Sequence, residues 1–130
     1  MVTAGVSLAL QGMDLQPSDL DLQSDADAAY AIEARLAEFV THPVRWRESQ
    51  RIRSHFGALE IGGIKVEIMG GVEHRLEDGS WLASPGTASI TRWIEYEGLR
   101  LPVTDLSYEA GAYTLLGREE KARIIRDFLA

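Results

Sequence analysis

Two alternating runs on either side of a Gly-Gly pair constrain the fold of this chain more than any other feature. Residues 59–61 and 64–69 flank Gly62 and Gly63, and apolar side chains alternate with charged ones along the second run. Two adjacent glycines suit the primed turns of β-hairpins, and a period of two is typical of a strand with one buried face. The segment 59–69 is therefore predicted to be an antiparallel hairpin, which the pair Gly70-Gly71 would end.

Helical spacing of apolar residues occurs before and after a series of strand-like segments. Residues 26–40 repeat apolar side chains at helical spacing until Pro43, and residues 105–116 and the segment that closes the chain show the same period. Between them, a strand is expected at 44–48, and further hairpins at 72–81 and 93–103. Antiparallel strands that follow one helix predict an α+β protein with a C-terminal pair of helices.

Composition limits the size, the partners and the location of the protein. With 130 residues, 45% of them hydrophobic, the chain is expected to form a single domain over residues 1–130. The net charge of −7 argues against a broad nucleic-acid footprint or an anionic membrane surface as partner. The sequence has no cysteine, which excludes thiolate metal sites. No segment suggests a signal peptide or a membrane anchor, so we expect a cytoplasmic protein.

Two carboxylates separated by one apolar residue form the first candidate site. Asp19 and Asp21 alternate with Leu20 and Leu22, so on a strand both carboxylates point to one face. Like charges this close repel each other unless a cation lies between them, and oxygen ligands suit a divalent ion. The same pattern also occurs in solvated turns and at strand ends, so spacing alone leaves both readings open.

A third carboxylate lies in the second strand of the predicted hairpin. Glu67 and Lys65 share the face opposite Ile64, Val66 and Ile68. If this strand lies next to the Asp-x-Asp segment, Glu67 completes a cluster of three acids that would suit a two-metal site.

These motifs resemble the nucleotidyltransferase superfamily of the DNA polymerase beta type. The family pattern is a Gly-Ser turn, about ten residues, Asp-x-Asp and a later acidic strand residue, and here it is matched by Gly5, Ser7, Asp19, Asp21 and Glu67. The chain is also similar to small bacterial nucleotidyltransferase-like proteins of unassigned function, in which a run like residues 51–57 precedes the hairpin. One departure is Val6, which stands where the family has a glycine, and β-branched residues resist positive φ.

The resemblance implies a mixed, mostly antiparallel sheet and a metal-dependent reaction. Asp19, Asp21 and Glu67 would bind Mg²⁺ or Mn²⁺, and a nucleoside monophosphate would pass from a triphosphate such as ATP to an acceptor hydroxyl. The acceptor could be a small molecule, a protein or RNA. The nucleotide would be bound by residues on three segments: Gly5, Ser7, Arg53, His55 and Lys65. For Arg53 and His55, a solvated basic strand edge is an equally weighted alternative.

Two other functions remain open at this point. A catalytically inactive relative could act as a regulatory or antitoxin-like subunit, with a protein partner or as a homodimer. A phosphohydrolase could use the same acidic cluster, but the chain offers no obvious motif that activates water.

Overall fold

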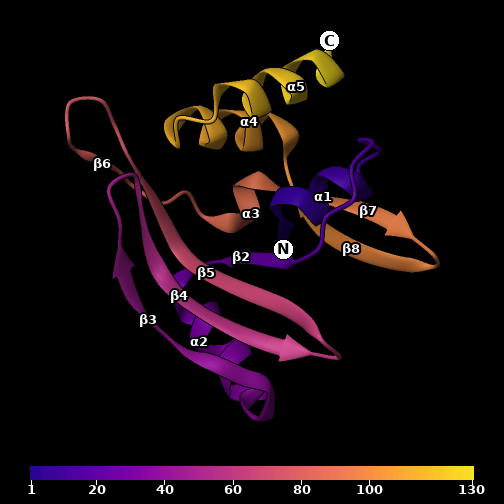
Figure 1. The fold of residues 1–130 in the computed structure, drawn as a ribbon, viewed down its shortest axis with the longest axis vertical. Helices are drawn as coiled ribbons and strands as arrows, with labels where there is room; N and C mark the ends of the chain where they lie inside the picture. Colours follow the sequence, from indigo (N-terminus) through magenta and orange to yellow (C-terminus); the bar gives the residue numbers. More distant parts are fainter.

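The order of helices and strands follows the expected α+β pattern. A computed structural model describes residues 1–130, and its first half runs β1 (Val2–Thr3), α1 (Ala4–Leu10), β2 (Leu20–Ser24), α2 (Ala26–Arg35), the 3-10 helix η1 (Ala37–Phe39), β3 (Val40–Glu48) and β4 (Ile52–Ile61). The second half runs β5 (Ile64–Arg75), β6 (Trp81–Leu82), α3 (Thr87–Ile90), β7 (Thr91–Tyr96), β8 (Leu99–Thr104), α4 (Leu106–Leu115) and α5 (Glu119–Leu129). The predicted C-terminal helical pair is confirmed as α4 and α5, which lie side by side (Figure 1).

All eight strands belong to one mixed sheet. Its order is β3-β4-β5-β2-β1-β8-β7, and β6 pairs with the far end of β5. Only β2–β5 and β1–β8 are parallel, while the remaining pairs are antiparallel. The mixed, mostly antiparallel sheet that the resemblance implied is thus confirmed. No helix is both long and apolar enough to cross a bilayer.

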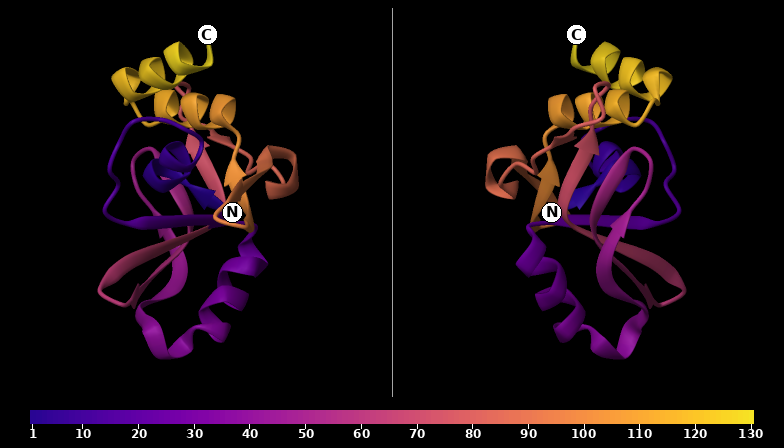
Figure 2. Two further views of the ribbon diagram at one scale, coloured as in Figure 1. Left: turned by 90° about the vertical axis from the view of Figure 1, so that its right-hand side faces the viewer. Right: turned by 90° about the vertical axis from the view of Figure 1, so that its left-hand side faces the viewer.

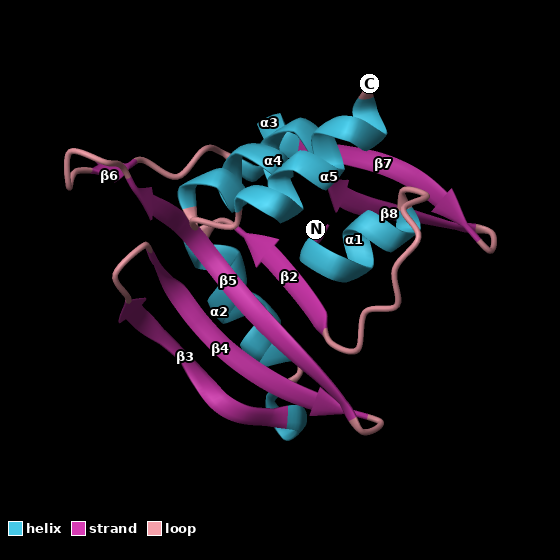
Figure 3. Cartoon of the chain, turned by 45° about the horizontal axis from the view of Figure 1, so that its top comes forward, coloured by secondary structure: helices cyan, strands magenta, loops and turns pink.

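The helices bury apolar side chains on opposite faces of the sheet. Helix α2 covers one face, where Ala29 packs with Leu59, Val66 and Ile68. Helices α1, α4 and α5 share a second cluster that contains Leu8, Ala110, Tyr113, Ala122 and Ile125. The two side views place α2 apart from the C-terminal helices (Figure 2). Figure 3 shows that β3 and β4 remain uncovered by helices on the face opposite α2.

The glycine pair in β5 does not end the strand, contrary to the sequence prediction. The register of β4 and β5 shifts between Arg53 and His55, opposite Gly70 and Gly71, and Gly71 takes a φ of +61°. Such an extra residue is a β-bulge, and it exchanges the faces of the residues beyond it. Accordingly Ile68 packs against α2, whereas His74 lines a cavity beside Tyr108 of α4.

The boundaries around Pro43 also differ from the prediction. The helix expected over 26–40 ends at Arg35, and strand β3 starts at Val40 and runs through Pro43. Proline lacks the N–H of a sheet ladder, but β3 is an edge strand, where one side needs no partner. The predicted hairpins at 59–69 and 93–103 are confirmed as β4–β5 and β7–β8.

Candidate functional site

Asp21 and Glu67 lie directly opposite each other on adjacent strands. Strands β2 and β5 run parallel with Asp21 paired to Glu67, and β1 places Thr3 on the other side of Asp21. Paired residues of neighbouring strands point to the same face. The other face of β5 at this point carries Val66 and Ile68, which pack against α2. Both carboxylates therefore lie on the face of the sheet opposite α2. We call it the open face, because no helix covers it at β3 and β4.

The environment of Asp21 disfavours its charged form. Burial is the largest cause, followed by the negative charges of Glu67, Asp19 and Glu109, and together they raise the pKa of Asp21 to about 6. Desolvation and like charges both act in this direction. A bound cation would offset both the burial of this carboxylate and its repulsion by the neighbouring acids.

Lys65 supplies one positive charge at this position. Its Nζ lies 2.9 Å from Oε1 of Glu67, and that contact is the main reason why the pKa of Lys65 is raised, with smaller effects from Asp19 and Asp21. Asp19 itself is exposed just before β2. The charges of all three predicted acids thus act on one lysine, although no three His, Cys, Asp or Glu side chains are arranged as ligands of one ion.

The donor set fits a hard divalent cation by its chemistry. It consists of carboxylate oxygens, which Mg²⁺ and Mn²⁺ prefer, and Asp21 and Glu67 come from two paired strands that fix their spacing. The charge that Lys65 now balances at Glu67 is the charge that a metal ion would balance.

The turn before α1 departs from what the sequence suggested. Val6 lies inside α1, so it needs no positive φ, and the residue in the left-handed region is Ala4, with a φ of 56°. Ser7 is fully buried, and its hydroxyl accepts a hydrogen bond from Nε2 of Gln11. Ser7 is thus enclosed in the packing of α1, and Gly5 lies in the first turn of the same helix beside Pro17.

Glu109 joins the site from α4 and was not anticipated from the sequence. It is 4% exposed, and its carboxylate accepts hydrogen bonds from the hydroxyl of Thr3 and the N–H of Ala4. Burial is the main cause that raises its pKa. Its only sequence signal was its place beside the apolar Ala110 on a helix, which does not distinguish it from an exposed glutamate.

Arg53 and His55 do not lie near the carboxylates, which corrects the sequence prediction. Arg53 pairs with Glu73 in the register of β4 and β5, six residues beyond Glu67 and about 20 Å along the strand. His55 lies on the opposite face, where its Nδ1 is 2.8 Å from the hydroxyl of Tyr30 in α2. The alternation that placed both residues on one face of β4 was correct, but the face was the one that α2 covers.

Comparisons with known proteins identify the family of this chain. The model of the aminoglycoside-2''-adenylyltransferase family matches residues 1–129. A crystal structure of a Thermotoga maritima protein with the provisional name nucleotidyltransferase is 46% identical, with a TM-score of 0.86, and the alignment covers 99% of this chain and 80% of that one. A search of curated proteins found no match. The chain belongs to the aminoglycoside-2''-adenylyltransferase family and is a nucleotidyltransferase-like protein.

Proposed function

We propose that residues 1–130 form a single domain that transfers a nucleoside monophosphate from a nucleoside triphosphate to an acceptor hydroxyl with the help of a divalent metal ion. The observation that carries this proposal is the pairing of Asp21 with Glu67 across β2 and β5, in surroundings that raise the pKa of Asp21 to about 6. Membership of a nucleotidyltransferase-like family supports the reaction class. The choice of metal, nucleotide and acceptor is our own inference.

The three acidic residues would hold Mg²⁺ or Mn²⁺. When bound, such an ion neutralises charge on the phosphates and lowers the pKa of an acceptor hydroxyl. Asp19 and Asp21 would bind it from one strand and Glu67 from the next. Burial and the neighbouring acids favour a positive ion over two free carboxylates, as the raised pKa of Asp21 indicates.

The remaining groups would orient the substrates. The ammonium of Lys65 would donate hydrogen bonds to phosphate oxygens once an ion balances the charge of Glu67. Glu67, which points to the open face, would accept the proton of the acceptor hydroxyl as the bond to the α-phosphorus forms and pyrophosphate leaves. The carboxylate of Glu109 accepts a hydrogen bond from the N–H of Ala4, which fixes the start of α1 beside Asp21.

Label transfer from two positions of the nucleotide tests this proposal. The protein is incubated with Mg²⁺, a bacterial lysate and nucleoside triphosphates labelled with ³²P at either the α or the γ position. We expect label from the α position to enter an acceptor, and label from the γ position to leave as pyrophosphate. Transfer of the γ label would contradict nucleotidyl transfer, because it indicates phosphoryl transfer instead.

Variants link the reaction to the acidic site. Asp21→Asn and Glu67→Gln should each abolish transfer of the α label, while Asp14→Asn, in the loop before β2, should leave it intact. Mn²⁺-dependent binding of a non-hydrolysable ATP analogue is measured in parallel. If the wild-type protein neither binds the analogue nor transfers label, the proposal fails.

One observation favours a second candidate, a non-catalytic subunit that keeps the fold. The contact of 2.9 Å between Lys65 and Glu67 already balances charge at the site without a metal ion. In that case Lys65→Met should lower the stability of the protein and create no activity. In the catalytic case, the same change should strengthen the binding of Mn²⁺, because an internal competitor is removed.

A further inference from the structure

A pair of arginines lies on the same open face as the carboxylates. Arg45 pairs with Phe56, and Arg47 pairs with Ser54, in the register of β3 and β4. Phe56 is paired in turn with Met69 of β5, two residues beyond Glu67. Since paired residues share a face, Arg45 and Arg47 lie on the side of the sheet that carries Asp21 and Glu67.

The distance between the two arginines and the carboxylates suits an acceptor that is bound at both places. Strands lie about 4.8 Å apart, so Arg45 is about 10 Å across the sheet from Glu67, and the pairing of Phe56 with Met69 places it about 7 Å farther along the strands. Arg47, opposite Ser54, lies about another 7 Å along the strands, toward the β3–β4 turn. The arginines are therefore too distant to join the metal ligands. An extended acceptor, held by its anionic end at the two arginines, spans the distance to the carboxylates with its reactive hydroxyl.

The two guanidinium groups are free to bind an anion. Neither Arg45 nor Arg47 makes an ion pair, whereas Arg53, on the same hairpin, is paired with Glu48 and Glu73. The guanidinium carbon of Arg47 lies 5.0 Å from the centre of the Phe56 ring. Stacking on an aromatic face orients a guanidinium and leaves its in-plane N–H groups available.

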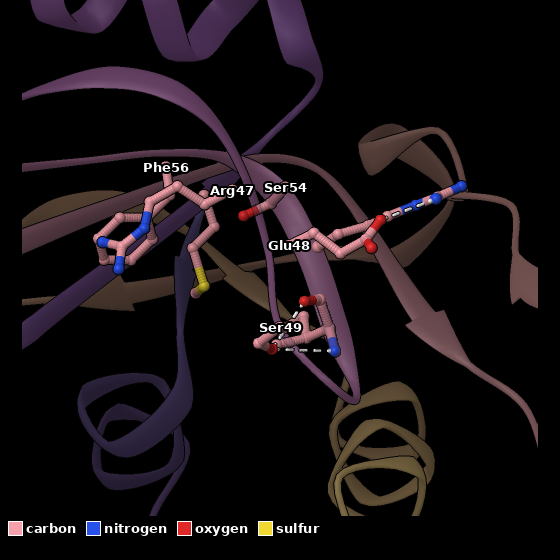
Figure 4. Close-up of a pocket in the computed structure, with 8 residues that line it drawn as sticks. Arg47, Glu48, Ser49, Ser54 and Phe56 are labelled. Carbon is pink, nitrogen blue, oxygen red and sulfur yellow. Dashed lines mark hydrogen bonds and ion pairs between the residues drawn. The ribbon is translucent and has the colours of Figure 1, made fainter.

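Two hollows in the surface share Arg47 and Phe56 in their lining. One, of about 340 Å³, is lined by His42, Pro43, Arg45, Arg47 and Phe56. The other is lined by Arg47 and Phe56 again, together with Ser54 and Met69, and lies toward the β3–β4 turn. Figure 4 shows the side chain of Arg47 against the ring of Phe56, with Glu48 on the other side of this second hollow.

We propose that Arg45 and Arg47, supported by Phe56, form an anion subsite for the acceptor, which therefore carries a phosphate or carboxylate group. This inference rests on the proposed nucleotidyl transfer. Aminoglycosides, after which the family is named, carry several ammonium groups. Two unpaired guanidinium groups would repel an ammonium group at this subsite, so we infer that the part of the acceptor bound there is anionic.

A matched pair of small probes tests the subsite. The ¹⁵N-labelled protein, saturated with Mg²⁺ and a non-hydrolysable ATP analogue, is titrated with phenyl phosphate and, separately, with benzylamine and kanamycin. We expect phenyl phosphate to shift the NMR signals of Arg45, Arg47 and Phe56, and the two cationic probes to leave these signals unchanged. Shifts caused by kanamycin, or no shifts caused by phenyl phosphate, would overturn the subsite.

Variants distinguish the acceptor from the nucleotide as the source of the anion. Arg45→Gln together with Arg47→Gln should raise the Kd of phenyl phosphate at least about tenfold, as expected for the loss of charge-assisted hydrogen bonds. The Kd of the ATP analogue should stay the same, and Arg35→Gln, on α2 behind the sheet, should change neither value. Weaker binding of the ATP analogue in the double variant would instead assign both arginines to the triphosphate.

The same titration also separates this inference from the proposed function. If the ATP analogue and Mg²⁺ shift the signals of Asp21 and Glu67 while phenyl phosphate binds nowhere, only the subsite is wrong. If the analogue does not bind at all, the proposed nucleotidyl transfer is wrong as well.

Discussion

Asp21 and Glu67 face each other across the parallel pair β2–β5, so two carboxylates from distant parts of the sequence meet on one face of the sheet. The burial of Asp21, together with this repulsion, has a consequence for stability. The pKa of Asp21 is about 6 in the folded protein, against a usual value of 3.8. Between these values the folded state binds more protons than the unfolded state, so the free energy of unfolding falls as pH rises.

We therefore expect Asp21→Asn to remove part of the pH dependence of stability. Below about pH 4 the group is protonated in both states and contributes nothing, and above pH 6 the full penalty is present. After allowance for solvent screening, the penalty is about 1 to 2 kcal/mol. Urea unfolding at pH 4.5 and pH 7.5 measures it. An identical difference between the two pH values in wild type and variant would contradict this assignment, and Asp14→Asn serves as the control.

Binding of a divalent metal ion should offset the loss of stability that ionised Asp21 causes above pH 6. Mn²⁺ at a hundred times its Kd should stabilise the native state by about 2.7 kcal/mol, because the ion binds only the folded protein. The effect should weaken below pH 6, where Asp21 becomes protonated and must lose its proton to bind metal. Thermal unfolding with and without Mn²⁺ measures the shift. An equal shift in the double variant Asp19→Asn, Asp21→Asn would exclude these residues as ligands.

The parts of the site that could be predicted are those that depend on short-range alternation. Asp19, Asp21 and Glu67 share a parity within their own segments, and a period of two suffices to place each on a face. Nothing in the sequence states which strands become neighbours. The pairing of β2 with β5 crosses α2 and two strands, so it was available only through the family resemblance.

The failures arose where the face or the partner of a residue depends on how distant segments come together. The bulge at Gly70 and Gly71 exchanges the faces of β5, and the α2 side of β4 carries His55. The alternation of side chains correctly places Arg53 and His55 on one face of β4, but it does not show which face carries the site. Glu109 was missed for a related reason, because its partners Thr3 and Ala4 are more than a hundred residues away.

Glu109→Gln should lower the pKa of Asp21. The amide keeps an oxygen that accepts from Thr3 and Ala4, but it removes one of the negative charges that raise the pKa of Asp21. A titration of the aspartate carboxyl ¹³C signals measures the change. Glu120→Gln, on the exposed side of α5, is the matched control. An unchanged Asp21 titration would show that Glu109 is itself neutral near pH 6.

Arg53→Ala should lower the melting temperature and leave nucleotide affinity unchanged. The guanidinium lies 2.7 Å from Glu73 and 3.2 Å from Glu48, and it stacks on Trp81 at 4.4 Å. These contacts join β3, β4, β5 and β6, far from the carboxylates. Thermal unfolding and the Kd of an ATP analogue are measured on the same preparation. A loss of nucleotide binding with normal stability would restore Arg53 to the site.

Ala4→Gly should stabilise the protein and preserve the site. Ala4 has a φ of 56°, a region that costs a residue with a Cβ about 1 to 2 kcal/mol and costs glycine almost nothing. The added freedom of glycine in the unfolded chain offsets about 0.5 to 1 kcal/mol, so we expect a net gain of about 0.5 to 1 kcal/mol. Chemical denaturation measures the gain, and Ala9→Gly, inside α1, should instead be destabilising by about 1 kcal/mol. Because the N–H of residue 4 still donates to Glu109, Mn²⁺ affinity should not change. If Ala4→Gly destabilises the protein as much as Ala9→Gly, the left-handed turn at the start of α1 is wrong, and the hydrogen bond from the N–H of residue 4 to Glu109 must be reconsidered with it.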